Sequence, residues 1–226
     1  MSGTWHRVLL AEFLGTALLL AVVVGSGHMG ETLSAGNAAI ALLANSTATG
    51  LALWWLILLF APISGAQFNP LVTASLVVNG EVPWRAALGI VLVQCLGAVA
   101  GVMLAHAMFD LPWLMQGVKP RASPGLWLSE VVATAGLMLT ILLGRQRAAP
   151  ALPALIAAYI AAAYWFTAST SFANPAVTLA RAFTTTFAGI RLVDVPAFVA
   201  AQSLGAVIAW GLARALAGPT PHRAIP

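Results

Sequence analysis

The chain has 226 residues, of which 61% are hydrophobic and only 7% are charged. A soluble domain typically carries about 25% charged residues, so this composition excludes an ordinary soluble protein. The net charge of +4 is modest, and the scattered basic residues form no patch that would indicate a nucleic-acid partner. The composition predicts a multi-pass α-helical protein whose surroundings are the lipid bilayer.

Six stretches are long and apolar enough to cross a bilayer, since about 20 residues of helix span its hydrocarbon core. They cover residues 8–28, 37–61, 85–107, 126–144, 151–169 and 194–217. The first stretch contains Glu12 and ends without a clean cleavage site, so we expect a retained span and not a signal peptide. Cys95 is the single cysteine, so no intramolecular disulfide can form.

Basic residues near the span ends predict the orientation, because cytoplasmic ends of membrane proteins carry an excess of Lys and Arg. With the N-terminus inside, the inner side holds Arg7, Arg85, Arg145, Arg147, Arg214 and Arg223. The outer side holds Lys119, Arg121, Arg181 and Arg191. This mild bias predicts that both termini are cytoplasmic.

Two further stretches are too apolar for ordinary loops and too short to span. They are "PISGAQFNPLVTASLVVNGEVP" after the second span and "TSFANPAVTLARAFTTTFAGI" after the fifth. Asn is a strong helix N-cap and Pro suits the first helical turn, so Asn69-Pro70 and Asn174-Pro175 each predict the start of a half-helix. Irregular backbone at membrane depth must be buried in protein or line a watery cavity. We therefore expect two reentrant segments that meet halfway through the membrane.

The sequence also contains an internal repeat. "AEFLGTALLL" resembles "SEVVATAGLM", "QFNPLVT" resembles "FANPAVT", and "VQCLGAVAGVML" resembles "AQSLGAVIAWGL", in the same order and at similar spacing. We expect one channel domain over residues 1–226, with halves at about 1–110 and 126–226. Each half has three spans, so the halves are inverted in the membrane, an arrangement that places functional sites near the midplane.

The paired asparagines predict a particular chemistry. An Asn side-chain oxygen can cap its own helix, which leaves the amide NH₂ to donate to the oxygen of a passing solute. Two half-helix N-termini add positive partial charge at the same place, which repels cations and protons but not neutral molecules. A pair of unrelated turns is the alternative interpretation, and the matched positions in the repeat disfavour it.

The order of "AEFLGT", "SGAQFNPLVT", "QCLGA" and "NPA" along the chain resembles the major intrinsic protein family, the aquaporins and aquaglyceroporins. The resemblance covers nearly the whole chain. It implies a right-handed bundle of six helices and two half-helices, assembled as a homotetramer with a pore in each subunit. It places Asn69, Pro70 and Leu71 in the first paired motif, with Leu71 in place of the usual Ala, and Asn174, Pro175 and Ala176 in the second.

Intramembrane carboxylates are costly and need partners. We expect Glu12 and Glu130 to accept hydrogen bonds from the reentrant backbone, with Gln94 and Gln202 assisting. The alternative is a proton-coupled secondary transporter in which these glutamates titrate. The four histidines have no metal-ligand spacing, and no catalytic cluster is evident, so we expect no cofactor, no metal and no enzymatic activity.

The resemblance also implies a constriction outside the paired motifs, usually with an Arg after the second one. Val177 stands at that position, and counting without gaps from the asparagines adds Thr49, Ala162 and Ser171. This small, uncharged set predicts a wide pore for water, glycerol, urea and neutral metalloid hydroxides such as arsenite. The motif "NPAVTLAR" resembles bacterial aquaglyceroporins associated with arsenic resistance, which implies a bacterial inner membrane. Arg181 lies one helical turn beyond Val177, and it either lines the outer mouth or extends to lipid headgroups.

Overall fold

The computed structural model describes residues 2–216, and this part of the chain is built from helices without a strand. Its long helices are α1 (Ser2–Leu33), α2 (Ala38–Ser64), α4 (Trp84–Met108), α5 (Pro124–Arg147), α6 (Leu152–Phe166) and α8 (Val195–Leu216). Its short elements are α3 (Pro70–Val78), α7 (Pro175–Ala180) and the 3₁₀ turns η1 (Ala149–Ala151), η2 (Arg181–Phe183) and η3 (Leu192–Asp194). Arg223 and residue 217 of the predicted sixth span lie outside the described residues.

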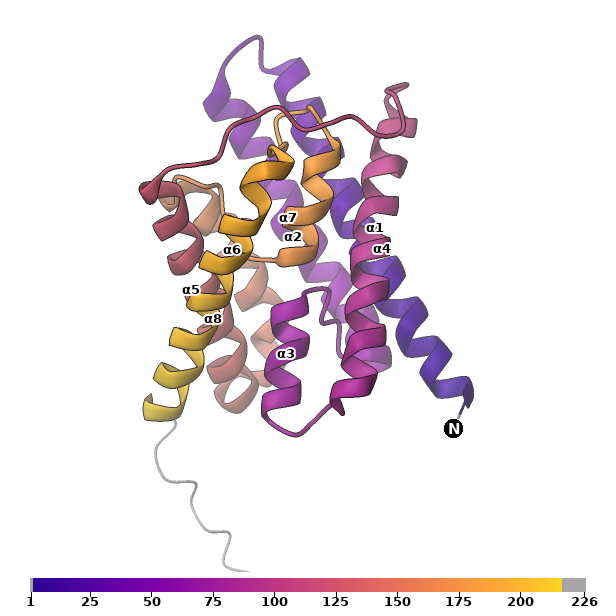
Figure 1. Ribbon diagram of the computed structural model, residues 1–226, viewed down its shortest axis with the longest axis vertical. Coiled ribbons are helices and arrows are strands. Elements are labelled where there is room, and N and C mark those ends of the chain that lie inside the picture. Colours follow the sequence, from indigo (N-terminus) through magenta and orange to yellow (C-terminus); the bar gives the residue numbers. More distant parts are fainter. Residues whose placement is uncertain (1, 217–226) are drawn as a thin grey trace, which may run out of the picture.

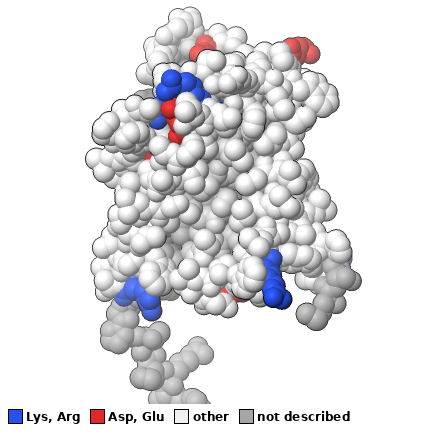
Figure 2. All heavy atoms as spheres, in the orientation of Figure 1, with Lys and Arg blue, Asp and Glu red and all other residues white. Residues whose placement is uncertain are grey.

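The long helices are the six that hydropathy predicted, and each is apolar enough to cross a membrane. On the face drawn in Figure 2, charged side chains lie at the two ends of the molecule and the middle is uncharged. The helix α1 continues to Leu33, past the predicted end at residue 28, because hydropathy detects only the apolar part of a helix. The expectation of an all-helical, multi-pass membrane protein is confirmed.

The bundle is made of two similar sets of helices. In the first half α1 packs against α2 and α4, in the second α5 packs against α6 and α8, and α2 meets α6 between them. Glycine permits the closest crossings, because a Cβ at Gly101 would collide with the Ala17 carbonyl, and one at Gly205 with the Val131 carbonyl. Each half thus has one tight helix pair, α1 with α4 and α5 with α8.

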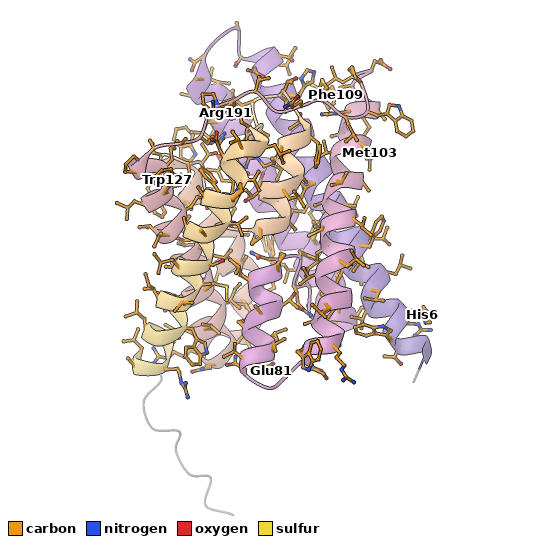
Figure 3. The ribbon with its side chains drawn as sticks, in the orientation of Figure 1. His6, Glu81, Met103, Phe109, Trp127 and Arg191 are labelled. Carbon is orange, nitrogen blue, oxygen red and sulfur yellow. The ribbon has the colours of Figure 1, made fainter. Side chains whose placement is uncertain are left out.

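The two short helices point in opposite directions from the middle of the bundle. In Figure 1, α3 lies in the lower half and α7 in the upper half, and the two helices contact each other. We call the end of the bundle reached by α3 the α3 end and the opposite one the α7 end. Figure 3 shows Glu81 and His6 at the α3 end and Arg191 and Phe109 toward the α7 end.

Basic residues of the described chain lie at both of these ends. The start of α1 and the end of α8 lie at the α3 end (Figure 1), where Arg145 pairs with Glu81 and Arg147 donates to the Leu216 carbonyl. The segment 109–123, which carries Lys119 and Arg121, runs across the α7 end (Figure 1).

Candidate conduction pathway

A cavity of about 310 Å³ lies inside the bundle. Its lining includes Arg181 from the α7 end, Asn69 and Asn174 from the starts of the half-helices, and Arg145 from the α3 end. Most of the remaining lining is apolar and comes from α1, α2, α5 and α6, for example Leu53, Ile57, Leu137, Ile141 and Ile156. The cavity therefore passes both asparagines, from Arg145 at the α3 end to the buried side chain of Arg181.

The first reentrant segment begins at Gly65, which caps the end of α2 and whose left-handed φ of 86° turns the chain back into the bundle. Phe68 also has a positive φ, of 49°, which is uncommon for a residue with a Cβ. This conformation points consecutive backbone N–H groups the same way, as in an anion-binding nest. The Glu12 carboxylate accepts from the N–H of Gln67 at 2.9 Å and of Phe68 at 2.8 Å. Asn69 then caps α3 by accepting from the Leu71 N–H.

The second reentrant segment repeats this geometry from the other side. Ser171 and Ala173 have positive φ values of 49° and 48°. The Glu130 carboxylate accepts from the N–H groups of Phe172 and Ala173, both at 2.9 Å. Asn174 caps α7 by accepting from two backbone N–H groups. The two carboxylates thus bind the two residues that precede each capping asparagine.

A glutamine supports each of these carboxylates. Gln94 donates through Nε2 to Glu12 at 2.8 Å and to the Thr73 hydroxyl at 3.1 Å. Gln202 donates through Nε2 to Glu130 at 2.6 Å and to the hydroxyl of Thr178. Both glutamates and both glutamines are completely buried, and none of them lines the cavity. Each carboxylate binds the reentrant backbone, and each glutamine joins that carboxylate to a hydroxyl of the half-helix, so the four side chains hold the reentrant segments in place.

The two asparagines also bind across the repeat, which the sequence did not suggest. Asn69 donates through Nδ2 to the Ala173 carbonyl, and Asn174 donates through Nδ2 to the Phe68 carbonyl, each at 2.8 Å. An amide NH₂ has two hydrogens, so one hydrogen of each asparagine joins the half-helices and the other is left for the cavity. Leu71 packs against the hydrophobic core and does not line the cavity.

The predicted constriction is partly wrong in its membership. Thr49, Ser171 and Val177 are buried and line the cavity, whereas Ala162 is exposed on the outside of α6. Counting along the sequence failed because a shift of one or two positions along a helix turns a side chain to another face. On α6 the cavity is lined instead by residues four apart, including Ile156, Ile160 and Tyr164, a periodic stripe that the sequence contains.

Tyr164 is the cavity-lining residue of α6 that sequence reasoning missed. Its side chain is 3% exposed and its hydroxyl lies 3.2 Å from the Thr49 hydroxyl, so the two side chains form a hydrogen bond between α6 and α2. The wall of the cavity therefore carries a hydroxyl pair at this level, in addition to Ser171.

Arg181 is buried and does not extend to the surface, so the headgroup alternative is wrong. Only 1% of the residue is exposed, its Nε donates to the Ala188 carbonyl, and its guanidinium lies over the ring of Phe172. Because Arg181 also lines the cavity, its positive charge borders the path beyond Val177.

A second buried arginine was not recognised from the sequence. Arg121 donates through Nε to the Gly189 carbonyl at 3.0 Å and through Nη1 to the Ser169 carbonyl at 2.9 Å. Burial lowers the pKa of its guanidinium to about 10, against the attraction of Glu130, so Arg121 is still charged at neutral pH. No local pattern distinguishes it from the exposed Lys119 nearby.

A path through an inverted-repeat bundle, with two capped half-helices meeting at its middle, defines the molecule as a membrane channel. Residues 2–162 match the family described as "Major intrinsic protein". The chain is 53% identical over 213 residues to "Aquaglyceroporin AqpS" of Rhizobium meliloti (strain 1021), covering 94% of this chain and 91% of that protein. The chain belongs to the major intrinsic protein family.

Two further likenesses agree with this assignment. The chain is 30% identical over 170 residues to a "Probable glycerol uptake facilitator protein" of Thermotoga maritima, covering 68% of this chain and 71% of that protein. The solved structure of the aquaglyceroporin from Plasmodium falciparum has the same fold, with a TM-score of 0.77 at 21% identity over 95% of this chain and 98% of that one. The protein is a passive channel for small uncharged solutes and not an enzyme.

Proposed function

We propose that this channel conducts a broad set of neutral solutes: water, glycerol, urea and neutral metalloid hydroxides such as arsenite. The names of the two sequence relatives, an aquaglyceroporin and a probable glycerol uptake facilitator, support glycerol as a solute. In this proposal Asn69 and Asn174 each donate their second amide hydrogen to the solute oxygen at the midplane. The half-helix N-termini repel cations there.

The observation that carries the proposal is the uncharged side chain of Val177 in the cavity wall, with the guanidinium of Arg181 one turn further along. Thr49, Ser171 and Tyr164 contribute only hydroxyl groups to this part of the wall. Together, Val177 and the three hydroxyl-bearing side chains form a wide, weakly polar constriction that admits polyols. The roles of Pro70, Leu71, Pro175 and Ala176 are to start the half-helices, and those of the two glutamates and two glutamines are to hold them.

We further propose the molecular setting. The chain forms one channel domain whose repeat halves share one path, and four copies assemble as a homotetramer, as the family resemblance implies. The α3 end, which carries most of the basic span ends, faces the cytoplasm together with both termini. The membrane is the bacterial inner membrane.

Val177→Arg tests the constriction. Because a guanidinium would fill the path beside the hydroxyl pair, we expect glycerol permeability in proteoliposomes to fall by about tenfold or more, with a much smaller loss of water permeability. The measurement is stopped-flow light scattering with water, glycerol, urea and arsenite on one preparation.

Ala162→Val is the matched control, and its permeabilities should equal those of the unmodified protein because Ala162 lies outside the path. Equal loss of water and glycerol in folded Val177→Arg protein would place the constriction elsewhere. Saturable uptake driven by a proton gradient would favour a secondary transporter in which Glu12 or Glu130 titrates.

A further inference from the structure

Two arginines at the α7 end pack on the same phenyl ring. The Cζ atoms of Arg181 and Arg121 lie 3.4 and 4.7 Å from the centroid of the Phe172 ring, and the two residues are 1% and 4% exposed. Cations gain from contact with an aromatic face, but a phenyl ring carries no net charge. The packing therefore concentrates two positive charges in a buried place without neutralising them.

Neither guanidinium has a carboxylate partner among residues 2–216. The ion pairs of that part of the chain join Arg145 to Glu81 and Arg191 to Asp194. The guanidinium of Arg121 donates only to carbonyl groups. Arg181 donates through Nε to a carbonyl, and its two terminal nitrogens make no hydrogen bond in the described chain. A buried charge without a counter-charge is strongly unfavourable.

The nearest acidic groups are already used. Asp194 accepts from both Arg191 and the backbone N–H of Arg121. Glu130 attracts both buried arginines through space, but its oxygens accept from the reentrant backbone and from Gln202. The charge of Arg181 therefore has no carboxylate partner in the described chain, and a ligand in the cavity that it lines could neutralise it.

An unpaired hydroxyl faces the same cavity. Ser171 is 3% exposed, its Oγ has no hydrogen-bond partner in the described chain, and it lines the cavity with Arg181. The two residues flank Phe172, since Ser171 precedes it in the chain and Arg181 lies over its ring. Buried polar atoms without a partner are rare in folded proteins, so this hydroxyl indicates a ligand that accepts a hydrogen bond.

We propose that the α7 end of the cavity binds a small monovalent anion of the size of chloride, held by the terminal nitrogens of Arg181 and the Oγ of Ser171. Both groups can donate hydrogen bonds to an anion, and a hydrogen bond between charged partners is stronger than one between neutral groups. Arg121 adds a second positive charge at the Phe172 ring. Because the site lies in the path, the bound anion competes with neutral solutes that enter from this end.

Thermal unfolding of the purified full-length protein tests binding without depending on conduction. We expect chloride, at constant ionic strength against the bulky anion gluconate, to raise the melting temperature saturably, by about 4 °C at a tenfold excess over its dissociation constant. Ser171→Ala removes a hydroxyl that bonds nothing in the described chain, so it should fold normally and bind chloride about tenfold more weakly. Arg181→Gln should abolish the chloride response.

Lys119→Gln removes an exposed positive charge at the same end and controls for surface electrostatics, so its chloride response should match that of the unmodified protein. A melting temperature that ignores chloride, or a response that is equal in Ser171→Ala and the unmodified protein, would overturn the proposal.

The second measurement is glycerol flux in proteoliposomes. Flux should be slower in chloride than in gluconate, and Ser171→Ala should reduce this difference. This flux measurement rests on the proposed function. Protein that binds chloride but passes no glycerol in either anion would retain the anion site and refute the glycerol channel, whereas equal glycerol flux in both anions would refute the competition.

Discussion

The two reentrant segments have matching contacts around their asparagines and different cavity-lining side chains farther along the chain. Glu12 and Glu130 each accept from the two N–H groups before the capping asparagine, and each asparagine donates to a carbonyl of the other segment. These contacts satisfy buried backbone groups, and a buried group left unpaired costs about 1–3 kcal/mol. The shared part therefore tolerates little change in either half.

The cavity-lining positions of the two segments differ. Leu76 and Arg181 both stand seven residues after their asparagine, and Ala66 and Ser171 both stand three residues before it. All four line the cavity. At these matched positions the first segment has apolar side chains, whereas the second has a hydroxyl group and a charged guanidinium. Since these side chains satisfy no backbone group of the other segment, they can diverge without disturbing the meeting point. The two halves of the repeat therefore share the framework around the asparagines and differ in the polarity of the cavity wall.

The largest expected effect comes from breaking the shared contacts. Glu12→Gln and Glu130→Gln each leave one backbone N–H facing an amide NH₂, so each should lower the free energy of unfolding by about 2–4 kcal/mol. Thermal melting in detergent measures the loss. Glu31→Gln, at an exposed position, is the control and should change little. A variant of one half that melts like the unmodified protein would show that the halves are not energetically equivalent.

Arg181→Leu removes the main difference by making position 181 match Leu76. We expect cation leakage through proteoliposomes to rise by about a hundredfold, since a unit charge met at close range in protein surroundings opposes a cation by a few kcal/mol. Ion-selective flux assays with sodium and potassium measure it, and glycerol flux verifies that the variant folds. Unchanged cation exclusion would assign the barrier to the half-helix termini alone.

The smallest effect concerns the ion pair at the α3 end. Arg145 lines the cavity and donates to both oxygens of Glu81, and this hydrogen bond lowers the pKa of Glu81, against a smaller effect of burial. A lowered pKa in the folded state adds stability above the unfolded pKa, and that stability is lost as the pH falls through the folded value. Both side chains are about 40% exposed, so we expect under about 1 kcal/mol.

Melting curves of the unmodified protein and of Glu81→Gln, recorded from neutral pH down to about pH 3, measure this contribution. The two proteins should differ at neutral pH and converge as Glu81 is protonated. A constant difference over the whole range would mean that the pair contributes no pH-dependent stability.

The sequence by itself determined the elements and the middle of the path. Hydropathy located the six spans because lipid requires long apolar helices. Asn69 and Asn174, each followed by proline, marked the starts of α3 and α7 because capping and φ preferences act locally. The repeat predicted that Glu12 and Glu130 would have equivalent surroundings.

Only the tertiary structure decided which side chains face the cavity at the α7 end. A shift of one or two positions along α6 separates the exposed Ala162 from the lining stripe that ends at Tyr164, and gap-free counting does not determine the rotation of a helix about its axis. The burial of Arg121 and Arg181 depends on carbonyl groups of the segment 182–190 and on Phe172. These partners are brought together by packing and not by spacing along the chain, so local rules do not reveal them.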